Sequence, residues 1–171
     1  MKYKVLRKQN NSAKCIVCGP KNGLSLNARF FEVENEQGEV LLLAVFKPRP
    51  EHQSYPGRTH GGITAAILDE AVGRAMQIQN PNVWGVTIEL SIKYRKVVPY
   101  DEELYCETKI TKTASRSFEG EGKLLSKDGT VLATSYGKYL VLPVDKIAEE
   151  GLDEENWYYI DEEVPEYIEI G

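Results

Sequence analysis

The chain has 171 residues, of which 42% are apolar and 27% are charged, and its formal net charge is −5. This length corresponds to about one globular domain, and the near-average composition excludes a disordered chain and a small disulfide-stapled scaffold. No apolar run reaches the roughly 20 residues of a membrane-spanning helix, and no apolar segment follows the basic N-terminal residues as it would in a secretory signal. We therefore expect a cytoplasmic protein without a membrane partner.

The charge is unevenly distributed along the sequence. Residues 145–171 contain eleven acidic residues and one lysine, whereas residues 1–144 carry a net charge of +5. A mildly basic body suits a small anionic ligand, but it lacks the dense basic runs of a nucleic-acid-binding protein. We predict a domain over residues 1–142 and an acidic extension over residues 143–171, whose aromatic residues indicate that part of it docks on the domain.

A cysteine pair, Cys15 and Cys18 in CIVCGP, lies near the N-terminus. One such pair supplies two of the four ligands of a structural zinc site, and the remaining candidates are Cys106, His52 and His60. Cys106, however, lies in an alternating strand pattern and is interpreted as a small buried hydrophobe. We favour a turn whose cysteines pack inward over a metal half-site shared by two subunits, and predict no metal.

Two strands follow this turn, one over residues 24–33 with alternating apolar and polar residues and one over residues 40–46 that is apolar on both faces. Residues 61–79 then show the long, Ala-rich pattern of a helix. Four more strands are predicted after it, over residues 86–95, 103–111, 115–126 and 130–142. An Asp-Gly hairpin signal joins the last two. This order predicts an α+β fold in which a long central helix is wrapped by a curved antiparallel β-sheet.

One acidic residue interrupts the apolar face of the predicted helix. On a 3.6-residue period, Asp69 shares its stripe with three apolar residues and is the only polar member. Its neighbour Glu70 lies on another face, where it forms a favourable i, i+4 pair with Arg74. No ion pair of this kind accounts for the carboxylate of Asp69, so Asp69 is a candidate general base or nucleophile.

The predicted helix begins with His60, Gly61 and Gly62, whose backbone N–H groups lie at the positive end of the helix dipole. Such N–H groups suit a polarised carbonyl oxygen or an oxyanion. Asp69 is about 10 Å further along the helix axis. The carboxylate and these donors therefore reach one small substrate only if two subunits share the site.

Two segments carry a family resemblance: HQSYPGRTHGGITAAILDEAVGRAM and the following WGVTIELSIKYRKVVPYDEELY. They resemble the hotdog-fold acyl-CoA thioesterases of the phenylacetate-pathway type, and the opening CIVCGPKNGLSLNARF recurs in a subgroup of these. The resemblance covers residues 15–142. It implies a hotdog fold, homodimers joined edge to edge through their sheets, and often a pairing of dimers into tetramers.

The resemblance also implies catalytic roles. Asp69 matches the residue that activates a water or attacks the thioester carbonyl, and Gly62 matches the backbone donor to the thioester oxygen, with His60 and Gly61 shaping the turn. Thr87 falls where relatives have a Ser or Thr that orients the water, although an ordinary strand-surface threonine fits the pattern equally well.

Substrate-binding positions implied by the resemblance are Gly57, in the loop before the helix, and the basic residues Arg95, Lys96 and Arg116 as partners of the CoA phosphates. Each basic residue is equally compatible with a solvated surface charge. Ser54 departs from the family, since relatives often have Gly at this position. No cofactor is expected, because CoA is part of the substrate.

These observations favour an acyl-CoA thioesterase with an Asp-activated water or an Asp nucleophile and a Gly backbone oxyanion hole at a dimer interface. The alternative is a non-catalytic hotdog module that binds an acyl-CoA or a small effector. A hotdog hydratase is a third possibility, but it requires an Asp/His pair whose spacing His60 and Asp69 do not supply. The sequence has no GxSxG nucleophile elbow, P-loop or GxGxxG motif.

Overall fold

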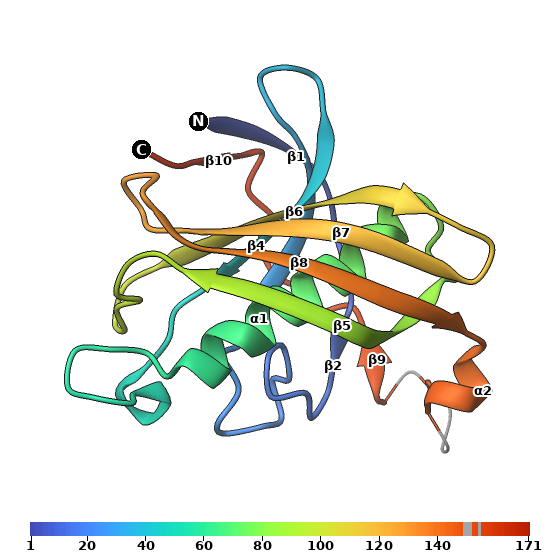
Figure 1. The fold of residues 1–171 in the computed structure, drawn as a ribbon, viewed down its shortest axis with the longest axis horizontal. Coiled ribbons are helices and arrows are strands. Elements are labelled where there is room, and N and C mark those ends of the chain that lie inside the picture. Colours follow the sequence, from blue (N-terminus) through green and yellow to red (C-terminus); the bar gives the residue numbers. More distant parts are fainter. Residues whose placement is uncertain (149–151, 154) are drawn as a thin grey trace.

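The computed structural model describes residues 1–148, 152–153 and 155–171. Its main feature is an eight-stranded antiparallel sheet in the order β10-β1-β3-β4-β6-β7-β8-β5, which curves around a central helix, α1 (Figure 1). Strands β2 and β9 form a separate two-stranded sheet. The bounds of the strands are β1 Lys2–Lys8, β2 Asn11–Ser12, β3 Arg29–Glu34, β4 Val40–Phe46, β5 Trp84–Tyr94, β6 Leu104–Thr113, β7 Ser117–Leu125, β8 Val131–Leu142, β9 Trp157–Tyr158 and β10 Tyr167–Glu169. The helices are η1 Pro50–His52, α1 Gly61–Ala75, η2 Met76–Ile78 and α2 Val144–Ile147.

The predicted order of two strands, one helix and four strands is present in β3, β4, α1 and β5 to β8. The predicted helix ends four residues early, because its last turn tightens into η2. The predicted strand over residues 24–33 was wrong at its start, since β3 begins only at Arg29. The N–H groups of Leu26 and Ala28 instead donate to carbonyls of the cysteine turn, at Ile16 and Val17, over 3.0 and 2.9 Å. This segment therefore holds the cysteine turn in place rather than extending the sheet.

Both ends of the chain contribute strands that the sequence pattern did not predict. β10 pairs with β1 at one edge of the sheet, so the two termini lie side by side (Figure 1). β9 pairs with β2, and the ring of Trp157 in β9 packs edge-on against Trp84 at a centroid distance of 5.0 Å. Parts of the acidic segment 143–171 thus dock on the body of the protein.

Helix α1 packs closely against the concave face of the sheet. Its fully buried residues include Ile67, Leu68 and Ala71. At Gly120 in β7 a Cβ atom would lie 2.7 Å from Val72 Cγ1, so only glycine lets the strand approach the helix this closely. Within the described part of the chain, no helix is long and apolar enough to cross a membrane.

Candidate active site

Asp69 is half-buried on α1 and is held by hydroxyl groups from two strands. Thr87 Oγ1, on the edge strand β5, donates to Asp69 Oδ1 over 2.8 Å. The hydroxyl of Tyr139, on β8, lies 3.1 Å from the same oxygen and 2.9 Å from the backbone carbonyl of Asp69. No described residue donates to Oδ2. One oxygen of the carboxylate is therefore fixed, and the other is available to a water or a substrate.

Tyr139 is a site residue that the sequence analysis missed. Its ring is buried and stacks on Phe118 at a centroid distance of 5.0 Å. Burial, followed by the charge of Asp69 and the hydrogen bond to it, raises the pKa of Tyr139, which keeps the hydroxyl protonated as a donor. Thr87 and Tyr139 are paired residues in the β5–β8 register. This pairing is what places both hydroxyl groups beside Asp69, and the sequence does not show it.

A cavity of about 320 Å³ lies beside these residues. One side of it is formed by α1 and the other by the start of β5, the end of β8 and the docked C-terminal segment. Its lining combines acids, a thiol and indole rings, among them Asp69, Thr87, Tyr139, Cys15, Glu70 and Trp157.

The N-terminus of α1 opens onto a second cavity, of about 460 Å³, whose lining shares no residue with the first. Gly61 lies in its wall together with the predicted phosphate partners Arg95 and Lys96, and Arg58 adds a third basic side chain. The chain thus collects positive charge beside the N–H groups at the start of a helix, an arrangement that favours an anion.

The predicted oxyanion donor is occupied in this structure. The N–H of Gly62 donates to Nδ1 of His60, the N-cap residue, over 2.9 Å, and the hydroxyl of Tyr94 donates to the Gly61 carbonyl over 2.7 Å. His60 therefore caps the helix, and its ring has to rotate away before the Gly62 N–H can donate to a substrate oxygen.

The structure does not bring two of the predicted substrate-binding residues to either cavity. Gly57 is exposed, has a φ of +80° that favours glycine, and donates its N–H to the Tyr100 hydroxyl over 3.1 Å. Arg116 is exposed in the turn between β6 and β7, where its carbonyl accepts from the N–H of Val141 over 2.9 Å.

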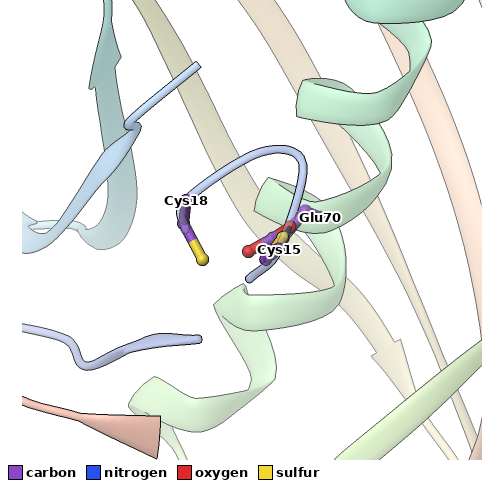
Figure 2. A group of neighbouring side chains, drawn as sticks. All are labelled: Cys15, Cys18 and Glu70. Carbon is purple, nitrogen blue, oxygen red and sulfur yellow. Dashed lines mark hydrogen bonds between the residues drawn. The ribbon is translucent and has the colours of Figure 1, made fainter. Parts of the chain in front are cut away.

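A cluster of Cys15, Cys18, Glu70 and Arg74 borders the first cavity, with the Glu70 side chain reaching from α1 toward the cysteine turn (Figure 2). The predicted Glu70–Arg74 pair is confirmed, with an N–O distance of 2.8 Å. Cys15 Sγ lies 2.9 Å from Glu70 Oε2, and Arg74 Nη2 lies 3.1 Å from Cys18 Sγ. Both cysteines point inward, as the sequence indicated, but Glu70 joins them, which the sequence pattern gave no sign of.

The two thiols differ in acidity. The hydrogen-bonded contact with Cys15, followed by burial, raises the pKa of Cys18, whereas the same contact lowers the pKa of Cys15. The remaining zinc ligands considered from the sequence lie outside this cluster. Cys106 is fully buried in β6, where burial raises its pKa, and His52 contacts the Arg49 N–H and the Leu24 carbonyl. His60 caps α1 through the Gly62 N–H.

Comparisons with known proteins show which family the chain resembles. Residues 56–133 match the model of the thioesterase superfamily. The acyl-coenzyme A thioesterase THEM5 of Mus musculus is 26% identical over 113 residues, which cover 66% of this chain but only 45% of the length of that protein.

Solved structures share the fold. The PaaI protein of E. coli, from the phenylacetic acid degradation operon, has a TM-score of 0.60 at 12% identity over 68% of this chain and 80% of that chain. A thioesterase protein of Streptococcus pneumoniae, solved with coenzyme A, has a TM-score of 0.55 at 18% identity over 60% of this chain and 79% of that chain. The chain therefore has the hotdog fold of these proteins, and its residues 56–133 are similar to the thioesterase superfamily. The predicted fold class and family resemblance are confirmed.

Proposed function

We propose that the protein is an acyl-CoA thioesterase that uses Asp69 as general base or nucleophile. The observation that carries this proposal is the Asp69 carboxylate, fixed through one oxygen by Thr87 and Tyr139 beside a cavity. A base in this position takes a proton from a water as the water attacks the thioester carbonyl, or the carboxylate itself attacks, and the CoA thiolate leaves. The chemistry requires no cofactor, and the likeness to a protein named acyl-CoA thioesterase supports the substrate class.

A complete site requires two subunits in this proposal. Asp69 and the helix N-terminus open onto separate cavities of one chain. Thr87 near the start of β5 contacts Asp69, whereas Tyr94 at its end contacts Gly61. Antiparallel pairing of β5 with a second copy of itself places the start of one strand beside the end of the other. Asp69 of one subunit then faces the helix N-terminus of its partner, where Gly62 supplies the oxyanion donor once His60 has rotated.

The free edge of β5 supports such a homodimer. β5 ends the sheet order and pairs with no described strand except β8. Exposed apolar side chains accompany this unpaired edge, with Val86 at 40%, Ile88 at 55% and Tyr94 at 53% exposure. A long, partly apolar edge strand is an association surface, and joining two copies through it is also the arrangement that the family resemblance implies. A further pairing into a dimer of dimers is compatible with the same edge contact.

The CoA portion is proposed to bind at the second cavity. Arg95, Lys96 and Arg58 line this cavity beside Gly61, and guanidinium and ammonium groups pair well with phosphates. The coenzyme A in the Streptococcus pneumoniae neighbour supports a CoA ligand for this fold. Gly57 and Arg116 line neither cavity within one chain, so a role for either in binding depends on the assembled dimer.

The test is the release of free CoA thiol from a panel of short, medium, long and aromatic acyl-CoAs by the purified full chain. Turnover of at least one acyl-CoA is expected, and the panel gives the acyl preference. Binding of an acyl-CoA by calorimetry without thiol release on any substrate would overturn the enzyme and favour the non-catalytic binding module.

We expect the Thr87→Val substitution to lower kcat with little change in KM. It removes the hydroxyl that holds Asp69 Oδ1 and keeps the shape of the side chain. Hydrogen bonds to charged groups are worth about 1.5–3 kcal/mol, which corresponds to a ten- to hundredfold loss. Steady-state thiol release measures this, and Thr87→Ser, which retains the hydroxyl, is expected to restore most of the activity. Equal losses in both variants would contradict the positioning role.

The Ile88→Lys substitution is expected to make the protein monomeric. A two-fold interface through β5 contains this position twice, and bringing like charges together across an interface costs several kcal/mol. Sedimentation velocity measures the outcome, with Leu24→Lys, a lysine at an equally exposed position away from β5, as the matched control. A wild-type chain that is monomeric throughout the concentration range would contradict the shared site.

A further inference from the structure

We propose that Cys15, Cys18 and Glu70 form a binding site for a soft divalent cation of the zinc class. The candidate ligand atoms, two thiol sulfurs and a carboxylate oxygen, all lie within 4.8 Å of one another (Figure 2). In a tetrahedral zinc site with sulfur and oxygen ligands, the ligand atoms lie about 3.5–3.8 Å apart. The 2.9 Å between Cys15 Sγ and Glu70 Oε2 has to widen by several tenths of an ångström, and the other separations have to shorten by at most about 1.3 Å.

Hydrogen-bond donors already surround both sulfurs. The N–H of Val17 donates to Cys15 Sγ over 3.2 Å, and the N–H of Ser12 donates to Cys18 Sγ over 3.4 Å. Arg74 Nη2 adds a charged donor to Cys18 Sγ. Donors of this kind orient metal-bound thiolates and stabilise their charge, and they form the outer shell that metal sites require.

The charge of the cluster suits a divalent cation. Two thiolates and the Glu70 carboxylate carry three negative charges, and Arg74 carries one positive charge. A divalent cation therefore brings the net charge of this partly buried cluster to zero, whereas the two thiolates without a metal leave an uncompensated negative charge. The guanidinium is fixed for this role, because it lies between the rings of Phe30 and Trp157, 4.3 and 4.6 Å from their centroids.

The fourth coordination position points to the first cavity. Cys15 and Glu70 line this cavity, whereas Cys18 is buried behind them at 1% exposure. Three protein ligands with one side open to a cavity leave room for a water or another small ligand. The cation would tie the cysteine turn to α1 at Glu70, next to Asp69. This site is distinct from the thioester chemistry proposed above and holds or fails independently of it.

The experiment uses the full chain, reduced and stripped of metal, and titrated with Co²⁺ alone. A thiolate-to-cobalt absorption band in the near ultraviolet, saturating at one Co²⁺ per chain and displaced by Zn²⁺, is expected. Cys15→Ser and Cys18→Ser should each abolish the band. Glu70→Gln removes a ligand and should weaken binding at least as much as the loss of an outer-shell partner does, by about 10- to 100-fold or more. Cys106→Ser removes the third thiol, outside the cluster, and should retain full binding.

Circular dichroism shows whether each variant is folded, and Cys15→Ala serves as a second variant where the serine disturbs the turn. A folded, reduced wild-type chain that gives no cobalt–thiolate band would overturn the site, as would a band that survives in Cys15→Ser. Because the readout is absorption and metal content, absence of thioesterase activity leaves the result unaffected.

Discussion

Replacing Asp69 with Asn is expected to lower kcat for thioester hydrolysis by about 10²- to 10⁴-fold, the range that general acid–base groups contribute. The amide keeps an oxygen that can accept from Thr87 and Tyr139, so the packing of α1 on β5 and β8 is preserved. It has neither the basicity to accept a proton from water nor the charge to attack a thioester. KM is expected to change little, because in the proposed site the acyl-CoA binds mainly through contacts that the substitution leaves in place.

The measurement is steady-state thiol release with the best substrate of the panel, together with a thermal unfolding curve that shows an intact fold. Asp161→Asn is the matched control, since it makes the same chemical change at an exposed position in the C-terminal segment. A folded Asp69→Asn protein with a kcat close to wild type would place the base elsewhere. Loss of activity in the Asp161 variant as well would indicate a general effect of lost negative charge.

The helical period was enough to single out Asp69, because one polar residue on an apolar stripe is visible in a sequence. No sequence pattern could single out Tyr139, because its contact with Asp69 depends on the β5–β8 register and on the curvature of the sheet over α1. Thr87 was named only through the family resemblance, since alternation places it on a strand face but does not say what that face meets. The period of apolar residues thus predicts which face of a helix or strand a residue occupies. Which residue it meets on a neighbouring element depends on the tertiary structure.

The cysteine turn illustrates the same limit. The pattern indicated that Cys15 and Cys18 pack inward, and Glu70 was given only its helical partner Arg74. Cys15, Cys18 and Glu70 meet because the N–H groups of Leu26 and Ala28 donate to the turn and hold it against α1.

Strand β1 was missed for a different reason. Four basic residues in Lys2–Lys8 obscure the alternation of apolar and polar residues. One of them, Lys8, is buried, and its ammonium group contacts the Ile160 carbonyl and Glu162.

Arg74→Met is expected to lower the free energy of unfolding by about 3–5 kcal/mol, the cost of breaking a buried ion pair from one side. The Arg74 side chain is 7% exposed and that of Glu70 is 20% exposed. The guanidinium also donates to the Asn10 carbonyl over 2.8 Å and packs against the rings of Phe30 and Trp157. Methionine fills part of the space between the rings but leaves Glu70 as a partly buried carboxylate with no cation beside it.

Urea unfolding in the presence of a chelator measures this loss without any contribution from bound metal. Lys109→Met is the control, because it breaks the Lys109–Glu39 pair, in which both side chains are about half exposed, and exposed pairs are worth at most about 1 kcal/mol. The double variant Glu70→Gln with Arg74→Met should be more stable than the sum of the single losses predicts, since the carboxylate left without its partner is then gone. Additive losses would show that Arg74 stabilises the fold by packing between Phe30 and Trp157 rather than by compensating the charge of Glu70.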